Sequence, residues 1–128
     1  MTNIAFVSSE KPEAKNSLKV LKRIYTNVSP DKADVIVALG GDGTILKSLH
    51  SFLKSKKPIY GMNRGNVGFL MNQYSEKNLH KRLTEAISYK LHPLKIKSFH
   101  EDGSIQNSLA FNDISMIRNS SKIAKIKI

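Results

Sequence analysis

The sequence predicts an α/β fold in which a parallel sheet with flanking helices is followed by the start of a β-rich region. Over the first ninety residues, short apolar runs alternate with stretches of helical periodicity, which is typical of βαβ units. In residues 34–39, Asp34 is followed by one continuous apolar run, as in parallel strands that are covered on both faces. Beyond Pro93, apolar residues recur at every second position, which indicates strands of a different kind. We therefore divide the chain into residues 1–92 and residues 93–128.

The first half of the α/β region predicts two strands joined by a helix. Residues 4–7 are a short buried strand, and residues 34–39, rich in β-branched side chains, are the clearest strand of the sequence. Between them, apolar residues recur at steps of three and four and predict an amphipathic helix with Ala14, Leu18, Leu21 and Tyr25 on one face. The arrangement is Rossmann-like.

Two further helices and one strand complete this region. A helix begins near Thr44 and ends in the segment 56–58, which contains Pro58. A third strand covers 58–62. A helix starts from Ser75 as N-cap, with Glu76 in its first turn. The apolar faces of the two helices are predicted to contain Ile45, Leu46, Leu49, Phe52 and Leu53 in the first, and Leu79, Leu83, Ala86 and Ile87 in the second.

The last part of the chain predicts antiparallel strands. Residues 94–99 alternate, a turn at 101–103 follows, and an extended stretch runs from Ser104 to Arg118. Residues 122–128, in which lysine and isoleucine alternate apart from Ala124, predict a final strand. Because that strand has no following turn or partner, we expect the chain to be a truncated part of a longer protein.

Composition narrows the class of protein. The chain has 21 Lys and Arg against 10 Asp and Glu, a net charge of +11, but its densest basic groups (54–57 and 122–127) contain no aromatic residues that could stack on bases. We interpret the charge as a solvated surface and expect no nucleic acid partner. With no cysteine, no apolar run of about 18 residues and only a short apolar run at the start, we expect a soluble cytoplasmic protein without membrane contact.

The segment that indicates chemistry is Leu-Gly-Gly-Asp-Gly-Thr at 39–44, between the clearest strand and a helix. Glycines let the backbone approach a ligand, and a helix start offers free N–H groups to phosphate. A carboxylate repels phosphate, so the presence of Asp42 in this loop requires an explanation. Three explanations are open: Asp42 holds a metal ion, it accepts the proton of an attacking hydroxyl, or it only caps the helix. The loop matches neither GxxxxGK[ST] nor GxGxxG, which makes P-loop enzymes and nicotinamide dehydrogenases poor candidates.

Three blocks carry a resemblance to a known family. The sequence GGDGT resembles the signature shared by NAD kinases, diacylglycerol and sphingosine kinases and, with Ser for Thr, phosphofructokinases. The segment GMNRGNVGFL at 61–70 is similar to the NAD kinase pattern G-x-N-x-G-x-x-G-F-L, whereas lipid kinases have a P-x-G-T-x-N-D version. The segment FNDIS at 111–115 resembles the family's N-E/D segment, with Asp where many members have Glu. The three blocks occur in the family's order.

The resemblance implies transfer of the γ-phosphoryl group of ATP, or a phosphoryl group of polyphosphate, to the 2′-hydroxyl of the adenosine ribose of NAD, with a divalent cation such as Mg²⁺. It implies that Asp42 is the catalytic base and binds NAD together with Gly43. The residues implied to lie along the donor phosphates are Gly40, Gly41, Gly43, Thr44 and Lys47, the last of which is Arg in many members. It also implies that the first region binds the nucleotide, that the second begins a β-rich NAD-binding domain, and that the protein is a homodimer or homotetramer.

Further NAD-binding residues implied by the resemblance have simpler alternatives. Asn112 and Asp113 suit a ribose or an adenine edge, or are a polar pair on the outer face of a strand. Phe69 and Leu70 lie near the adenine, or belong to the core. Asn63 orients a phosphate or ribose, or caps the turn before Gly65. Metal ligands stay unassigned, because the four histidines are dispersed along the chain.

Two other functions stay open at this point. The same glycine loop could belong to a kinase with a lipid or sugar acceptor. The segment 61–70 disfavours this alternative, because it resembles the NAD kinase pattern. The net charge of +11 could indicate a basic module that binds nucleic acid. The scattered positions of the lysines disfavour this alternative, because such a module has a clustered basic patch. The missing β-rich length also predicts weak or absent turnover for these 128 residues alone.

Overall fold

The computed structural model describes residues 2–66, 68–115, 117 and 123. The chain forms two compact units, residues 1–90 and 91–128, and each is described by itself. No helix among these described residues is long and apolar enough to cross a membrane.

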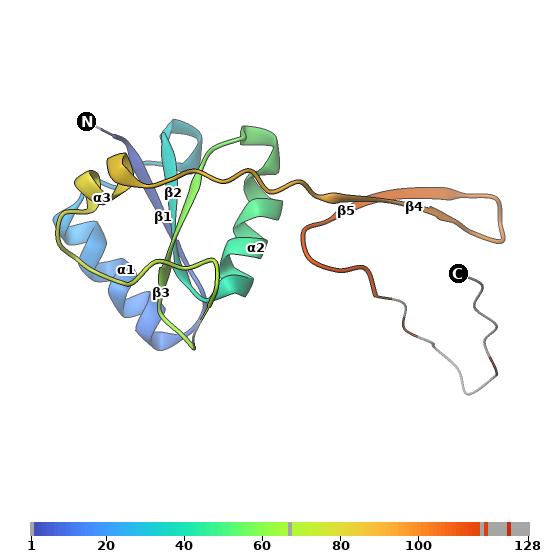
Figure 1. Cartoon of the computed structure of the whole chain (residues 1–128), viewed down its shortest axis with the longest axis horizontal. Coiled ribbons are helices and arrows are strands. Elements are labelled where there is room, and N and C mark those ends of the chain that lie inside the picture. Colours follow the sequence, from blue (N-terminus) through green and yellow to red (C-terminus); the bar gives the residue numbers. More distant parts are fainter. Residues whose placement is uncertain (1, 67, 116, 118–122, 124–128) are drawn as a thin grey trace. The chain divides into compact units, whose positions relative to one another are not determined.

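A three-stranded parallel sheet forms the centre of the first unit (Figure 1). Its order is β1 (Ile4–Ser8), β2 (Val35–Gly40) and β3 (Ile59–Asn63). Ile4 lies opposite Val35, and Ile36 lies opposite Ile59. Every residue of β2 is buried, which explains why its sequence is apolar without alternation. The predicted parallel sheet with flanking helices is confirmed.

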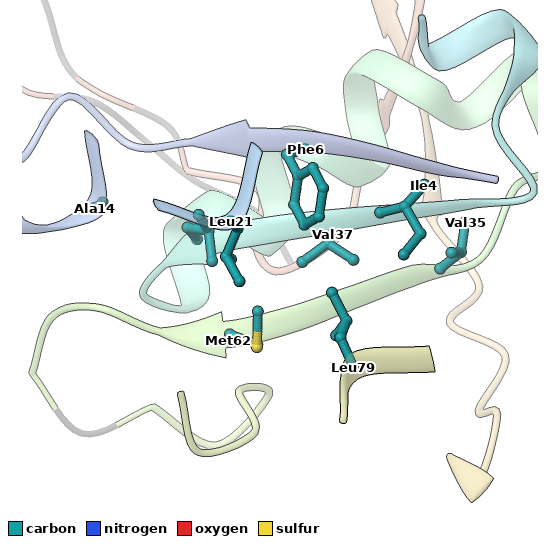
Figure 2. Close-up of a cluster of buried hydrophobic side chains, with 9 residues drawn as sticks. Ile4, Phe6, Ala14, Leu21, Val35, Val37, Met62 and Leu79 are labelled. Atoms are coloured by element: carbon teal, nitrogen blue, oxygen red, sulfur yellow. The ribbon is translucent and has the colours of Figure 1, made fainter. Parts of the chain in front are cut away.

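Two helices cover opposite faces of this sheet (Figure 1). Helix α1 (Pro12–Ile24) buries Ala14 and Leu21 on one face, and helix α2 (Asp42–Phe52) packs Phe52 near Ile36 on the other. Short 3₁₀ turns, η1 (Pro30–Lys32) and η2 (Leu53–Ser55), precede β2 and follow α2. Figure 2 shows the larger core cluster on the α1 face; its buried members are Ile4, Phe6, Ala14, Leu21, Val35, Val37, Leu39, Met62 and Leu79.

The third helix is shorter than the sequence predicted. Helix α3 covers Leu79–Glu85, not a span from Ser75, because Asn78 takes a left-handed conformation (φ 55°) that a helix cannot include. Ser75 instead accepts a hydrogen bond from the Lys77 N–H at 3.2 Å, which closes a separate turn. At the other end Ala86 is extended, so Ile87 is 77% exposed and the prediction that it shares the buried face is wrong.

The second unit is an antiparallel hairpin of β4 (Leu94–Phe99) and β5 (Ile105–Ala110). Gly103 has a positive φ of 81° in the turn and donates its N–H to the His100 carbonyl at 3.0 Å. The predicted antiparallel start of a β-rich region is confirmed. The extended stretch is shorter than predicted, since β5 ends at Ala110. Arg118 and the strand predicted over 122–128 lie outside the described residues, except for Ile123.

Candidate active site

The glycine loop and the segment 61–70 meet at one edge of the sheet. Because the three strands are parallel, their carboxyl ends all point to this edge. The main chain joins the three loops that leave it: the Ser9 N–H donates to the Leu39 carbonyl at 2.9 Å, and the Arg64 N–H donates to the Gly40 carbonyl at 2.7 Å. Two of the blocks identified in the sequence are thus in contact.

The three glycines of the loop are not equivalent. Gly40 is buried, and a Cβ atom there would lie 2.1 Å from the Thr44 hydroxyl oxygen, so the close approach of α2 requires glycine. At Gly41 and Gly43, a Cβ atom would meet no atom within 4 Å among the described residues. The packing of this unit therefore explains why residue 40 is glycine. It does not explain the glycines at 41 and 43, which face open space.

Helix α2 starts two residues earlier than predicted, at Asp42 with Gly41 as N-cap. The Thr44 N–H donates to the Gly41 carbonyl at 2.8 Å and closes the first turn. Asp42 is therefore the first helical residue, where a negative charge is favoured by the helix dipole. No side chain caps this helix start in the described structure, so the interpretation of Asp42 as a helix cap is wrong.

The Asp42 carboxylate is held instead by the loop that follows β3. One oxygen accepts the Phe69 N–H at 2.9 Å and the other accepts the Leu70 N–H at 3.0 Å. Gly68 allows this approach, because a Cβ atom there would lie 2.5 Å from the carboxylate oxygen Oδ1. Each carboxylate oxygen has two lone pairs, so one N–H on each leaves capacity to accept a further proton donor. The arrangement fixes a half-buried carboxylate beside a glycine-rich turn.

The side chains of Phe69 and Leu70 point away from the core. Phe69 is 98% exposed and Leu70 is 41% exposed, so the alternative that both are core residues is wrong. A fully exposed phenylalanine offers a flat apolar face to a ligand. Both residues thus hold Asp42 with main-chain atoms and present apolar side chains outward.

Thr44 and Lys47 line a cavity of about 320 Å³ between α2 and the end of β1. Hydroxyl groups dominate its polar lining, which includes Ser8, Ser9, Thr44, Ser48 and Ser51. Glu10 also lines it, and its pKa is lowered, mainly by a hydrogen bond and ion pair with Lys15 at 2.5 Å and to a smaller extent by the charge of Lys47. Sequence reasoning missed Ser8, Ser9 and Glu10, although their place at the carboxyl end of a strand of the same sheet was a usable signal.

Asn63 caps the turn that follows β3, since its side-chain oxygen accepts the Gly65 N–H at 2.9 Å. This is the simpler of its two predicted roles. Asn63 also lines a second cavity of about 510 Å³, and sequence reasoning missed three of the residues around it, which are Arg64, Asn72 and Tyr74. Only their position beside the motif could have pointed to them.

Asn112 and Asp113 belong to the second unit, where they follow β5 and are exposed. Because β5 ends at Ala110, the alternative of a polar pair on the outer face of a strand is wrong. Within the described part of the chain, no group of three or more His, Cys, Asp or Glu side chains is placed to hold a metal ion.

Comparisons with known proteins show the family of the chain. Residues 2–90 match the model of the ATP-NAD kinase N-terminal domain. The chain belongs to the NAD kinase family. This chain is 44% identical to the NAD kinase of Rhizobium meliloti over 98% of the chain's 128 residues. Over all of the chain's residues, it is 44% identical to the NAD kinase of Caulobacter vibrioides. It is 45% identical to the NAD kinase of Brucella suis over 96% of its length. The chain spans about half the length of these curated relatives (49%, 49% and 48%).

Proposed function

We propose that this protein transfers a phosphoryl group to the 2′-hydroxyl of the adenosine ribose of NAD and so forms NADP. The observation that carries the proposal is the Asp42 carboxylate, fixed by the Phe69 and Leu70 amides at a glycine turn of a chain that belongs to the NAD kinase family. Similar proteins from three bacteria are named NAD kinase.

In this proposal Asp42 orients the ribose hydroxyl and accepts its proton as the hydroxyl oxygen attacks the terminal phosphorus of the donor. The bond from that phosphorus to the bridging oxygen breaks, and ADP, or a polyphosphate one unit shorter, leaves. Phosphoryl transfer depends mainly on positioning and charge neutralisation, so a carboxylate whose direction is already fixed suits the step. The exposed ring of Phe69, next to the amide that holds Asp42, would cover the adenine, with Leu70 beside it. Asn63 would contribute through the turn that it caps.

The donor phosphates would lie over Gly41 and Gly43, where the described residues leave open space, and would extend toward Thr44 and Lys47. Gly40 would shape the turn, and Lys47 would add a single positive charge without the two-pronged geometry of arginine. We propose ATP as donor, with polyphosphate as the alternative. Mg²⁺ is commonly bound through substrate phosphates with only one or two carboxylates, so a donor complex would need few ligands from this chain.

Residues 93–128 would form the first strands of a β-rich NAD-binding domain, in which Asn112 and Asp113 contact NAD by hydrogen bonds. We further propose that the active form is a homodimer or homotetramer in the cytoplasm.

The test is formation of NADP by the intact protein, supplied with NAD and Mg²⁺ and either ATP or polyphosphate. Asp42→Asn keeps the shape of the side chain but removes the acceptor of the proton, and we expect kcat to fall on the order of 10²- to 10⁴-fold. Equal turnover by the intact protein and Asp42→Asn would remove Asp42 from the mechanism. If the intact protein formed no NADP with ATP and none with polyphosphate, the proposed function would be refuted.

A matched control comes from the same unit. The Asp34 carboxylate also accepts a backbone N–H, that of Asn3 at 2.7 Å, but lies at the other end of the strands. Asp34→Asn keeps an oxygen that can accept this N–H and removes the negative charge, as Asp42→Asn does at the other end, and we expect it to leave kcat unchanged. A fall in kcat for both variants would mean that damage to the fold, and not the position of Asp42, explains the loss.

A further inference from the structure

Residues 64–66 and 68–74, here called the β3 loop, return alongside the strand that they follow. The Asn63 N–H donates to the Asn72 carbonyl at 2.9 Å, and the Asn72 N–H donates to the Gly61 carbonyl at 2.9 Å. The Asn72 side-chain amide adds a bond to the same Gly61 carbonyl at 3.1 Å. Asn72 therefore extends the sheet beyond β3 and fixes the point at which the loop returns.

Two side chains close this loop. The Arg64 guanidinium, at the start of the loop, lies 3.4 Å from the centre of the Tyr74 ring at its end. The Arg64 Nε atom is buried and, among the described residues, has no hydrogen-bond partner. A planar guanidinium stacks on an aromatic face, so contact with the ring takes the place of a directed hydrogen bond here.

Both ends of the stack are anchored elsewhere in the first unit. At the start, the Arg64 N–H donates to the Gly40 carbonyl of the glycine loop at 2.7 Å. At the end, the guanidinium of Arg82 in α3 donates to the Gln73 carbonyl at 2.5 Å and to the Ser75 carbonyl at 3.3 Å. The stack thus joins the glycine loop to the segment held by α3.

We propose that Arg64 and Tyr74 are positioning residues for Asp42. Their stack holds the β3 loop in the one arrangement in which the Phe69 and Leu70 amides meet the two carboxylate oxygens. Loss of the stack frees the loop, and the carboxylate then turns away from its direction. The kinetic part of this inference rests on the proposed function, whereas the contact of the amides with Asp42 does not.

The first experiment is independent of any activity. Hydrogen exchange of the Phe69 and Leu70 amides is measured by NMR in the intact protein and in Arg64→Leu, Tyr74→Leu and Tyr74→Phe. We expect both leucine variants to exchange these amides on the order of tenfold faster, because a cation–π contact corresponds to a factor of a few to about thirty in an equilibrium. Tyr74→Phe keeps the aromatic face and should leave the rates unchanged.

The second experiment separates positioning from a structural role by kinetics. We expect Arg64→Leu and Tyr74→Leu to lower the kcat of NADP formation by about tenfold or more with little change in the KM for NAD, since misplacement of a reacting group lowers the rate of the chemical step. Tyr74→Phe should restore kcat. Lys57→Met is the control for stability, because Lys57 donates to the carbonyls of Pro30, Asp31 and Ala33, away from the loop.

The outcomes separate two claims: that the stack of Arg64 on Tyr74 fixes the β3 loop, and that the fixed loop positions Asp42 for the reaction. Unchanged amide exchange in both leucine variants would overturn the role of the stack, whatever the protein catalyses. Faster exchange with unchanged kcat would overturn the positioning role. A fall in kcat for Lys57→Met equal to that for Tyr74→Leu would assign the effect to stability and would also overturn it. If the unaltered protein forms no NADP while exchange responds as expected, the proposed function fails and the control of the loop by the stack stands.

Discussion

Alanine substitutions in the glycine loop test the division between packing and ligand approach. In Gly40→Ala, the new methyl group would lie 2.1 Å from the Thr44 hydroxyl oxygen, 2.9 Å from its Cβ and 3.2 Å from the Ser9 Cβ. Overpacking of this kind costs about 1 to 3 kcal/mol, and contact on two sides places this case in the upper part of that range. For a unit of this size the melting temperature should fall by roughly 10 to 20 °C.

The same substitution at Gly43 should have the opposite effect on stability. Its methyl group would meet no described atom within 4 Å, and Gly43 lies in the first turn of α2, where alanine is the better helix former. The expected change is between zero and a gain of about 1 kcal/mol. If the donor phosphates pass over Gly43, the methyl group blocks them, and kcat/KM should fall although the protein is at least as stable.

The assay pairs thermal unfolding followed by circular dichroism with NADP formation, for the intact protein and both variants. We expect Gly40→Ala to lower the melting temperature through packing alone, and Gly43→Ala to lower kcat/KM without a loss of stability. A Gly40→Ala protein as stable as its parent would refute the packing argument. A fully active Gly43→Ala protein would refute the path proposed for the phosphates.

Three further predictions concern other contacts. Gly68→Ala places a methyl group 2.5 Å from the Asp42 carboxylate and should displace it, which would lower kcat by about tenfold or more in the NADP assay; unchanged kcat would contradict this. Met62→Ala empties a fully buried site in the larger core cluster and should cost about 2 to 5 kcal/mol by denaturant unfolding. The pKa of Glu10 is lowered chiefly by the hydrogen bond from Lys15, so the pair stabilises the fold above the ordinary pKa of Glu and loses this effect as the pH falls through the lowered value. An NMR titration should show this low midpoint, and Lys15→Met should move it back toward the ordinary value.

The strands could be predicted from local patterns in the sequence. The run 34–39 predicts a strand covered on both faces, and β2 is buried at every residue. The period-two pattern after Pro93 likewise corresponds to the β4 and β5 hairpin. The start of α3 was predicted wrongly, because Ser75 and Glu76 are a good local signal, whereas the left-handed conformation of Asn78 ends the preceding turn. The observed helix start at Leu79 is held by a distant contact that no local pattern shows, since the Tyr25 hydroxyl accepts the Leu79 N–H at 3.1 Å across 54 residues.

The site was predictable as a set of residue types and not as a geometry. The glycines and Asp42 stand out because they follow a strand and precede a helix. The partners of the carboxylate could not be deduced, since the Phe69 and Leu70 amides lie 27 and 28 residues away and every residue except proline carries an N–H. The stack of Arg64 on Tyr74 was missed for a similar reason, because no local pattern pairs an arginine with a tyrosine ten residues later.

The bonds between the β3 loop and Asp42 use main-chain atoms of the loop only. A replacement of Phe69 by another amino acid other than proline keeps the N–H and therefore keeps the anchor. The outward-facing side chains at 69 and 70 can therefore be varied while the frame beneath them stays constant. If these side chains contact the acceptor as proposed, libraries at the two positions offer a route to altered acceptor preference that does not first have to rebuild the carboxylate.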